Sequence, residues 1–346
     1  MARMRRQLGV LLAVAGMLLG GSAYAGFSTD DILRQLKPQE REKLKAGEIV
    51  TVSRPEQESN DAGLAIGLVL IVPADLKKTL TTLQSLNVSN DPALRRITRE
   101  IKEPVRGDGS SKMFAAVGFA GDEGSEVKKM LAARPGEDFN FSEEELSWVR
   151  AAGSGGDTAQ SAANVMRRVL ASRYLAFQKG GLDGLPTYAR EGNRVTKPGA
   201  ELAASAEAMS TLRKREPDFY EAYRHYPKAK GQGVQHQFYW EKKTVEGRPM
   251  FSLRHELVQV KPDAALIGSR EYYINNQLNG LQVAILLLPY GAQTMAALVN
   301  ETYTDKVAGA GRFVAVHVGR GIVESNTKPL FEKLQKALGR ARPAAH

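Results

Sequence analysis

The 346-residue chain contains no cysteine and only five histidines. Without cysteine it can form no disulfide bond and cannot carry a lipid-modified cysteine. The histidines show no His-Glu-x-x-His spacing, so we expect no metal site and no cofactor. Ser125 and Ser325 each stand three positions before a lysine, but the Lys-Thr-Gly and Ser-Asp-Asn companions of serine acyl-enzymes are missing. No motif therefore identifies a catalytic reaction.

A hydrophobic run long enough to cross a membrane is also missing. The longest candidate, LGVLLAVAGMLLGG, is shorter than the roughly 20 residues that a membrane span needs. It follows arginines at positions 3, 5 and 6 and precedes the small-x-small pattern that ends at Ala25. This is the arrangement of a secretory signal peptide. We therefore expect cleavage of residues 1–25, a periplasmic protein, and no transmembrane segment in the mature chain.

The formal net charge is +10, and the basic residues are scattered along the chain. Scattered Lys and Arg are typical of solvated helix faces, and no basic cluster indicates nucleic-acid binding. A basic exported protein could still make peripheral contact with anionic envelope surfaces. We expect no nucleic acid among the partners.

Residues 234–305 are predicted to form an antiparallel sheet. Five runs rich in β-branched and aromatic residues are separated there by breaks that contain Gly, Pro or Asp. If Glu246-Gly247 is a two-residue turn, Phe238 pairs with His255 and Trp240 with Leu253. Alternation then puts these four side chains on one face, and Arg254 and Glu256 on the other.

The remaining chain is predicted to supply helices and short strands. We expect one α+β domain over residues 26–346, with a curved antiparallel sheet and a C-terminal helix packed on it. Its parts are N-terminal helices and strands (26–120), a helical insertion (121–227), the antiparallel strands and C-terminal helix (228–338), and a tail (339–346). Within the first part, 63–72, 94–104 and 112–120 are predicted strands. Whether 121–227 is an insertion or a small domain of its own is left open by the sequence.

His255 is the polar residue on the otherwise apolar face of the sheet. An unpaired buried imidazole is unfavourable by about 1–3 kcal/mol, so His255 needs a partner or a wet cavity. The next strand brings either Glu271 with Tyr273 or Arg270 with Tyr272 beside it, depending on register. One interpretation is a polar spot in an aromatic-lined small-molecule pocket. The other is a core histidine that a neighbouring group satisfies.

The order of elements resembles the helix-grip architecture of the START/SRPBCC superfamily: a strand, the helix PADLKKTLTTLQ, further strands, an antiparallel run and a last helix at 312–338. The segments FYWEKK, LRHELV, SREYYINN and NETYTDKVAG are similar to those of an uncharacterised family of exported bacterial proteins. Members of the superfamily hold apolar molecules between the curved sheet and the C-terminal helix. The resemblance therefore implies a periplasmic binding or carrier protein for a hydrophobic, lipid-like ligand.

The candidate ligand-binding residues share a place near the expected pocket or its rim. They are Tyr239, Trp240, His255, Arg270, Tyr272, Tyr273 and Asn300. Two alternative functions remain. One is an enzyme of cyclase or hydrolase type that uses His255 as acid and base, because imidazole titrates near neutral pH. The other is an envelope interaction protein without a ligand.

Overall fold

The computed structural model describes residues 26–53, 63–88, 95–136, 138–153, 158–305 and 327–339. The predicted signal peptide lies outside these residues. Eight of the described strands form one antiparallel sheet in the order β1-β2-β10-β9-β8-β7-β6-β3. Their bounds are β1 Val50–Ser53, β2 Gly63–Val72, β3 Ile97–Glu100, β6 Val234–Val245, β7 Arg248–Val260, β8 Ala265–Ile274, β9 Gly280–Tyr290 and β10 Gln293–Tyr303. The α+β fold class is as predicted from the sequence.

Local sequence accounts for the five long strands β6 to β10. They follow one another as a meander, and the predicted hairpin register between β6 and β7 is confirmed: Phe238 is opposite His255, and Trp240 is opposite Leu253. Glu246 and Gly247 form the turn with φ values of 49° and 76°. Positive φ at both turn residues matches the right-handed twist of the two strands.

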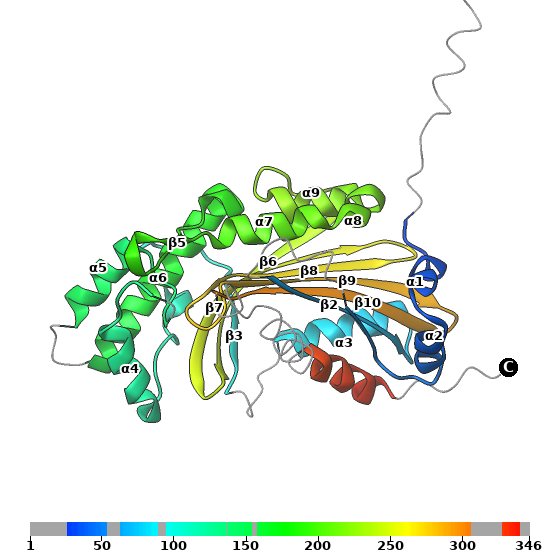
Figure 1. Cartoon of the computed structure of the whole chain (residues 1–346), viewed down its shortest axis with the longest axis horizontal. Helices are drawn as coiled ribbons and strands as arrows, with labels where there is room; N and C mark the ends of the chain where they lie inside the picture. Colours follow the sequence, from blue (N-terminus) through cyan, green and yellow to red (C-terminus); the bar gives the residue numbers. More distant parts are fainter. Residues whose placement is uncertain are drawn as a thin grey trace, which may run out of the picture.

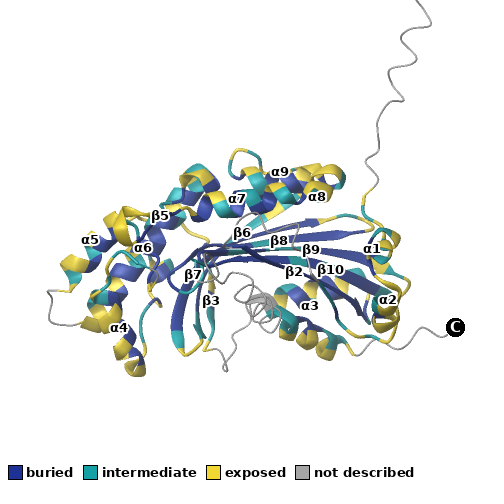
Figure 2. Cartoon of the chain, in the orientation of Figure 1, coloured by how far each residue is buried: buried dark blue, intermediate teal, exposed yellow. Residues whose placement is uncertain are grey.

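Helices cover both faces of the sheet (Figure 1). They are α1 Thr29–Gln35, α2 Pro38–Lys45, α3 Leu76–Val88, α4 Gly124–Leu131, α5 Glu143–Ala152, α6 Thr158–Gly180, α7 Pro198–Ala208, α8 Ser210–Arg215, α9 Pro217–His225 and a C-terminal helix at 327–338. In Figure 1 the sheet curves around α3 and the red C-terminal helix, while α7, α8 and α9 lie on its opposite side. Figure 2 shows the strands buried between these layers.

The C-terminal helix packs on the concave side of the sheet, as predicted, although residues 312–326 of the predicted helix lie outside the described residues. Its side chains Phe331 and Leu334 are 1% and 0% exposed and join one apolar cluster with α3 and the strands. Because β2 has helices on both sides, all ten of its residues are buried. A continuous apolar run such as GLAIGLVLIV is the pattern expected for a strand covered on both faces.

The helices of residues 121–227 belong to two apolar clusters. Helices α4, α5 and α6 share a cluster with the sheet residues Trp240 and Phe251. Helix α9 packs through Phe219 and Tyr223 on the convex face, in a cluster with β8 and β9. The strand predicted over 112–120 is wrong: Lys112–Phe114 is a short 3-10 helix. Phe114 and Val117, three positions apart, both lie in the buried cluster with α4, α5 and α6.

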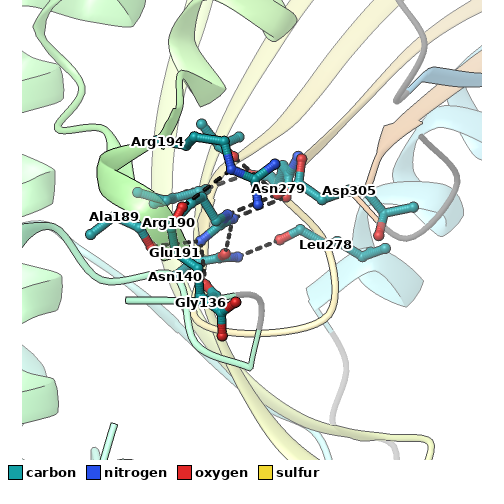
Figure 3. A network of polar contacts seen from close by, with 12 residues as sticks. Gly136, Asn140, Ala189, Arg190, Glu191, Arg194, Leu278, Asn279 and Asp305 are labelled. Atoms are coloured by element: carbon teal, nitrogen blue, oxygen red, sulfur yellow. Dashed lines mark hydrogen bonds and ion pairs between the residues drawn. The ribbon is translucent and has the colours of Figure 1, made fainter. Parts of the chain in front are cut away.

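A polar network joins the helical part to the end of the sheet (Figure 3). Its centre is Arg190, which is 6% exposed and donates through Nε to Asp305 at 2.9 Å. The same guanidinium donates to Asn140 Oδ1 at 2.8 Å and to the Gly136 carbonyl at 2.8 Å. A small hairpin, β4 Tyr188–Ala189 with β5 Val195–Thr196, carries this arginine. The network thereby fixes Asp305, two residues after the end of β10, against the helical part.

Candidate functional site

A cavity of about 340 Å³ lies between the concave face of the sheet and the two helices that cover it. Its apolar wall comes from α3, β8, the turn between β8 and β9, β9 and the C-terminal helix. The residues of this wall are Leu83, Leu86, Ile267, Leu278, Leu281, Val283, Ile285, Pro329, Leu330 and Phe331. A volume of this size is within the range of small-molecule sites.

The other end of the cavity is charged. Alternate residues of β6, β7 and β8 point to the concave face, and at this end they are ionisable or hydroxylated rather than apolar. The charged residues that line this end are Arg96, Glu241, Lys243, Arg254, Glu256 and Glu271, and Lys333 of the C-terminal helix also lines the cavity. Three of the acids are almost fully buried, with Glu241, Glu256 and Glu271 at 1%, 2% and 6% exposure. The cavity is therefore amphipathic.

Strand register explains how polarity changes along the cavity. On β8 the residues that face the cavity are Ile267, Ser269 and Glu271, in that order. Their partners on β9 place Ile285 beside Ile267 and Leu281 beside Glu271. At about 3.3 Å per residue, the four steps from Ile267 to Glu271 span roughly 13 Å. The cavity thus runs from an apolar end to a charged end over that length.

Ion pairs satisfy much of the charged end. Glu241 accepts from Arg96 at 2.7 Å and is 2.9 Å from Arg254. Burial on its own would raise the pKa of Glu241, but the nearby Arg254, Lys243 and Arg96 outweigh it and lower that pKa to about 2. Glu241 is therefore a carboxylate at any physiological pH. Lys243 Nζ donates to Glu271 Oε1 at 2.9 Å.

Asn300 connects the cavity wall to the helix above it. Its Nδ2 donates to Thr327 Oγ1 at 2.8 Å, at the first turn of the C-terminal helix. Its Oδ1 accepts from Thr302 Oγ1 at 3.1 Å. All three residues line the cavity. Of the seven residues proposed from sequence, Asn300 is the one found among the described lining residues.

The other proposed residues lie at two places. Tyr239 points to the concave face, where the Arg254 guanidinium stands 4.7 Å from its ring centre. Trp240 points to the opposite face and donates through Nε1 to the Met113 carbonyl at 2.7 Å. His255, Arg270, Tyr272 and Tyr273 are 0% exposed and also lie on that opposite face, against α6 and α9.

His255 is satisfied by a neighbouring side chain at one ring nitrogen. Its Nε2 is 2.9 Å from His236 Nδ1, and His236 Nε2 is 2.8 Å from the Lys230 carbonyl. The carbonyl can only accept, so His236 carries its proton on Nε2 and His255 donates from its own Nε2. Burial, Arg270 and His236 hold the pKa of His255 well below its usual 6.5. The imidazole is therefore neutral and stacks on Phe238 at 4.6 Å.

A β-bulge decides the register that the sequence left open. The pairing of β7 with β8 shifts between Leu253 and Arg254, so His255 lies opposite Arg270 and Leu253 lies opposite Tyr273. The extra residue, Tyr272, stacks on Phe177 at 4.0 Å. Both consecutive tyrosines consequently join the apolar cluster of the convex side. Arg270 donates from Nη2 to the Tyr223 carbonyl at 2.7 Å.

Apart from Glu271, which the sequence offered as a possible neighbour of His255, the charged residues of the cavity were not among the sequence candidates. The alternation in FYWEKK and LRHELV does place Glu241, Arg254 and Glu256 on one face, as the structure confirms. Charged residues on one face of a strand are usually solvated, so the pattern by itself did not mark a site. In the described part of the chain, no three His, Asp or Glu side chains converge to hold a metal ion. No helix there is long and apolar enough to cross a membrane.

Comparison with known proteins gives few matches. No protein family matches the sequence. No curated protein is significantly similar to it. Among solved structures, the di-domain ARO/CYC StfQ from the steffimycin biosynthetic pathway is similar to this chain at 14% sequence identity and a TM-score of 0.23. The match covers 54% of this chain and 61% of that chain, which is less than two thirds of its length.

Proposed function

We propose that the protein binds or carries an amphipathic, lipid-like small molecule in the cavity between the sheet and the C-terminal helix. The observation that carries this proposal is the cavity of about 340 Å³ with one apolar wall and one charged end. An apolar chain held against Val283, Ile285 and Phe331 would be shielded from water. Each buried methylene contributes about 0.8 kcal/mol before the losses of association are subtracted.

A binding function is preferred to an enzyme that uses His255, because the imidazole lies away from the cavity. It is 0% exposed, stacked on Phe238 and bonded to His236, on the face of the sheet away from the cavity. A ligand between the sheet and the C-terminal helix would be separated from it by the strand itself. We therefore assign no catalytic residue.

The proposal places the protein in the periplasm, on the strength of the signal-peptide pattern in residues 1–25. Fractionation of the producing cells followed by N-terminal sequencing tests this location. We expect the soluble periplasmic fraction to yield a chain that begins at Gly26. A chain that keeps its first residues, or one found in the cytoplasm, would contradict the location and leave the cavity unaffected.

The binding function is tested by native mass spectrometry of the gently purified protein and by extraction of its lipids. We expect a co-purified species that Val283→Trp excludes, because the larger side chain fills the cavity from β9. Val195→Trp is the matched control, since Val195 is 51% exposed on β5. An empty protein that also takes up no amphiphile would contradict the proposal. Salt-sensitive association with anionic vesicles by that empty protein would instead support the ligand-free envelope role.

A further inference from the structure

The charged end of the cavity contains a hydrogen-bond acceptor that no described residue donates to. Glu271 lines the cavity from β8 and is 6% exposed. Its Oε1 accepts from Lys243 Nζ, whereas its Oε2 is buried and accepts no hydrogen bond from any residue that the structure describes. Buried carboxylate oxygens are normally satisfied, so this atom can accept a hydrogen bond from an N–H or O–H group of a bound ligand.

Three of the four cations that line the cavity already contact carboxylates, and the fourth, Lys333, is an exposed residue of the C-terminal helix. Arg96 and Arg254 both lie within 2.9 Å of Glu241. Lys243 Nζ likewise lies 2.9 Å from Glu271 Oε1. An anionic head group in this space would bring further acceptor oxygens beside Glu271 and Glu256, and like charges at close range repel in a site of low dielectric. A donor would instead complete the hydrogen bonds of Glu271.

We infer that the ligand is an amphiphile whose head group is an amine or an alcohol that donates a hydrogen bond to Glu271 Oε2. This inference rests on the proposed function, and it adds the chemistry of the head group. The apolar body lies along Ser269 and Ile267 of β8 and their β9 neighbours toward Phe331. The roughly 13 Å between Ile267 and Glu271 suits an extended chain of about ten carbons.

The test uses three probes with the same ten-carbon chain: decylamine, decan-1-ol and decanoate. Each is titrated calorimetrically into the delipidated full-length mature protein at pH 7.5, below the concentration at which the probe forms micelles. We expect decylamine or decanol to bind at least about tenfold more tightly than decanoate, because a hydrogen bond to a charged acceptor is among the stronger ones. The amine and alcohol arms show which donor is preferred.

Glu271→Gln replaces the carboxylate with an amide that can also donate, so we expect it to reduce the preference for the donor probes by about tenfold. Glu332→Gln is the matched control, since Glu332 is an exposed residue of the C-terminal helix outside the cavity lining. Decanoate binding as tightly as the donor probes to the unaltered protein would overturn the inference while leaving the binding function standing. A preference that Glu271→Gln leaves unchanged would also overturn it. Failure of all three probes to bind would overturn the proposed function itself.

Discussion

Glu201 on α7 offers a sharp test of the electrostatics at the end of the sheet. The neighbouring Asp305 receives hydrogen bonds from Arg190 at 2.9 Å, Thr196 at 3.0 Å and Asn279 at 3.0 Å. Glu201 Oε1 has only a long contact of 3.4 Å from Asn279, and its Oε2 accepts nothing from the described residues. The network around Arg190 in Figure 3 therefore stabilises the Asp305 carboxylate far more than the Glu201 carboxylate.

Two causes raise the pKa of Glu201. Burial is the larger, and the negative charge of Asp305 adds to it; together they raise the pKa from 4.5 to about 7 despite Asn279 and Arg190. The unfolded chain ionises this carboxyl above pH 4.5, whereas the folded protein resists ionisation until about pH 7. Its favourable contribution to stability is therefore complete below pH 4.5 and is lost as the pH rises to about 7.

The magnitude follows from the same change. At about 1.4 kcal/mol per pH unit, ionised Glu201 destabilises the fold by about 3 kcal/mol as an upper bound. Residual solvent contact screens part of this, so we expect Glu201→Gln to increase the free energy of unfolding by about 1–3 kcal/mol at pH 8. At pH 4 both proteins carry a neutral side chain at this position, and the difference should be close to zero.

The assay is urea denaturation of both proteins at pH 4, 5.5, 7 and 8, with the difference in unfolding free energy plotted against pH. Titration of all other groups cancels in that difference. Glu191→Gln serves as the control, because Glu191 is an exposed neighbour whose carboxylate makes the same change in net charge. A difference that is flat with pH, or a loss of stability in Glu201→Gln at pH 8, would refute the reasoning.

Three further predictions concern stability. Phe331→Ala on the C-terminal helix should lower the free energy of unfolding by about 3–5 kcal/mol, because the Phe331 side chain is 1% exposed. Amide exchange should become faster in that helix, and faster exchange confined to other helices would contradict the prediction. Arg173→Met should lower the free energy of unfolding by about 3–5 kcal/mol, because Arg173 is fully buried and donates to the two Glu145 carboxylate oxygens at 2.7 and 2.6 Å. The double substitution Arg173→Met with Glu145→Met should recover part of this loss. Because its pKa is lowered in the folded protein, His255 contributes stability that is complete above the unfolded pKa of 6.5 and is lost at lower pH. Urea denaturation midpoints should therefore fall as the pH is lowered from 6.5 to 5. The fall should be smaller in His255→Phe.

Strand pairing near the turn was predictable from local sequence. Alternation and the Glu246-Gly247 turn set the β6–β7 register, because a slip by one residue would expose every apolar side chain of the hairpin. The pairing of β10 with β2 is different, since it joins Asn300 to Ile66 across more than half of the chain. Such a contact has no local sequence signal, and the resemblance in element order was needed to anticipate a helix over the sheet.

A helix over the sheet was predictable, but the face of the sheet that carries the cavity and the composition of the cavity were not. Alternation separates the two faces of a strand, yet it does not say which face a helix will cover. His255 and Arg254 are neighbours in sequence, and either side could have been the cavity. The bulge between Leu253 and Arg254 adds a second ambiguity, because it places the consecutive Tyr272 and Tyr273 on the same convex side without any marked residue in the sequence.

The sequence by itself determined the five long strands β6 to β10, the hairpin register and the amphipathic helix at 327–338, since these depend on the spacing of apolar residues along a few turns or strands. Only the tertiary structure decided that α3 and the C-terminal helix cover the face with Glu241, Arg254 and Glu271, whereas α6 and α9 cover the face with His255. The physical reason is burial. A charged strand face is solvated by default, and it becomes a site only when distant helices remove the water and leave its ion pairs around a cavity.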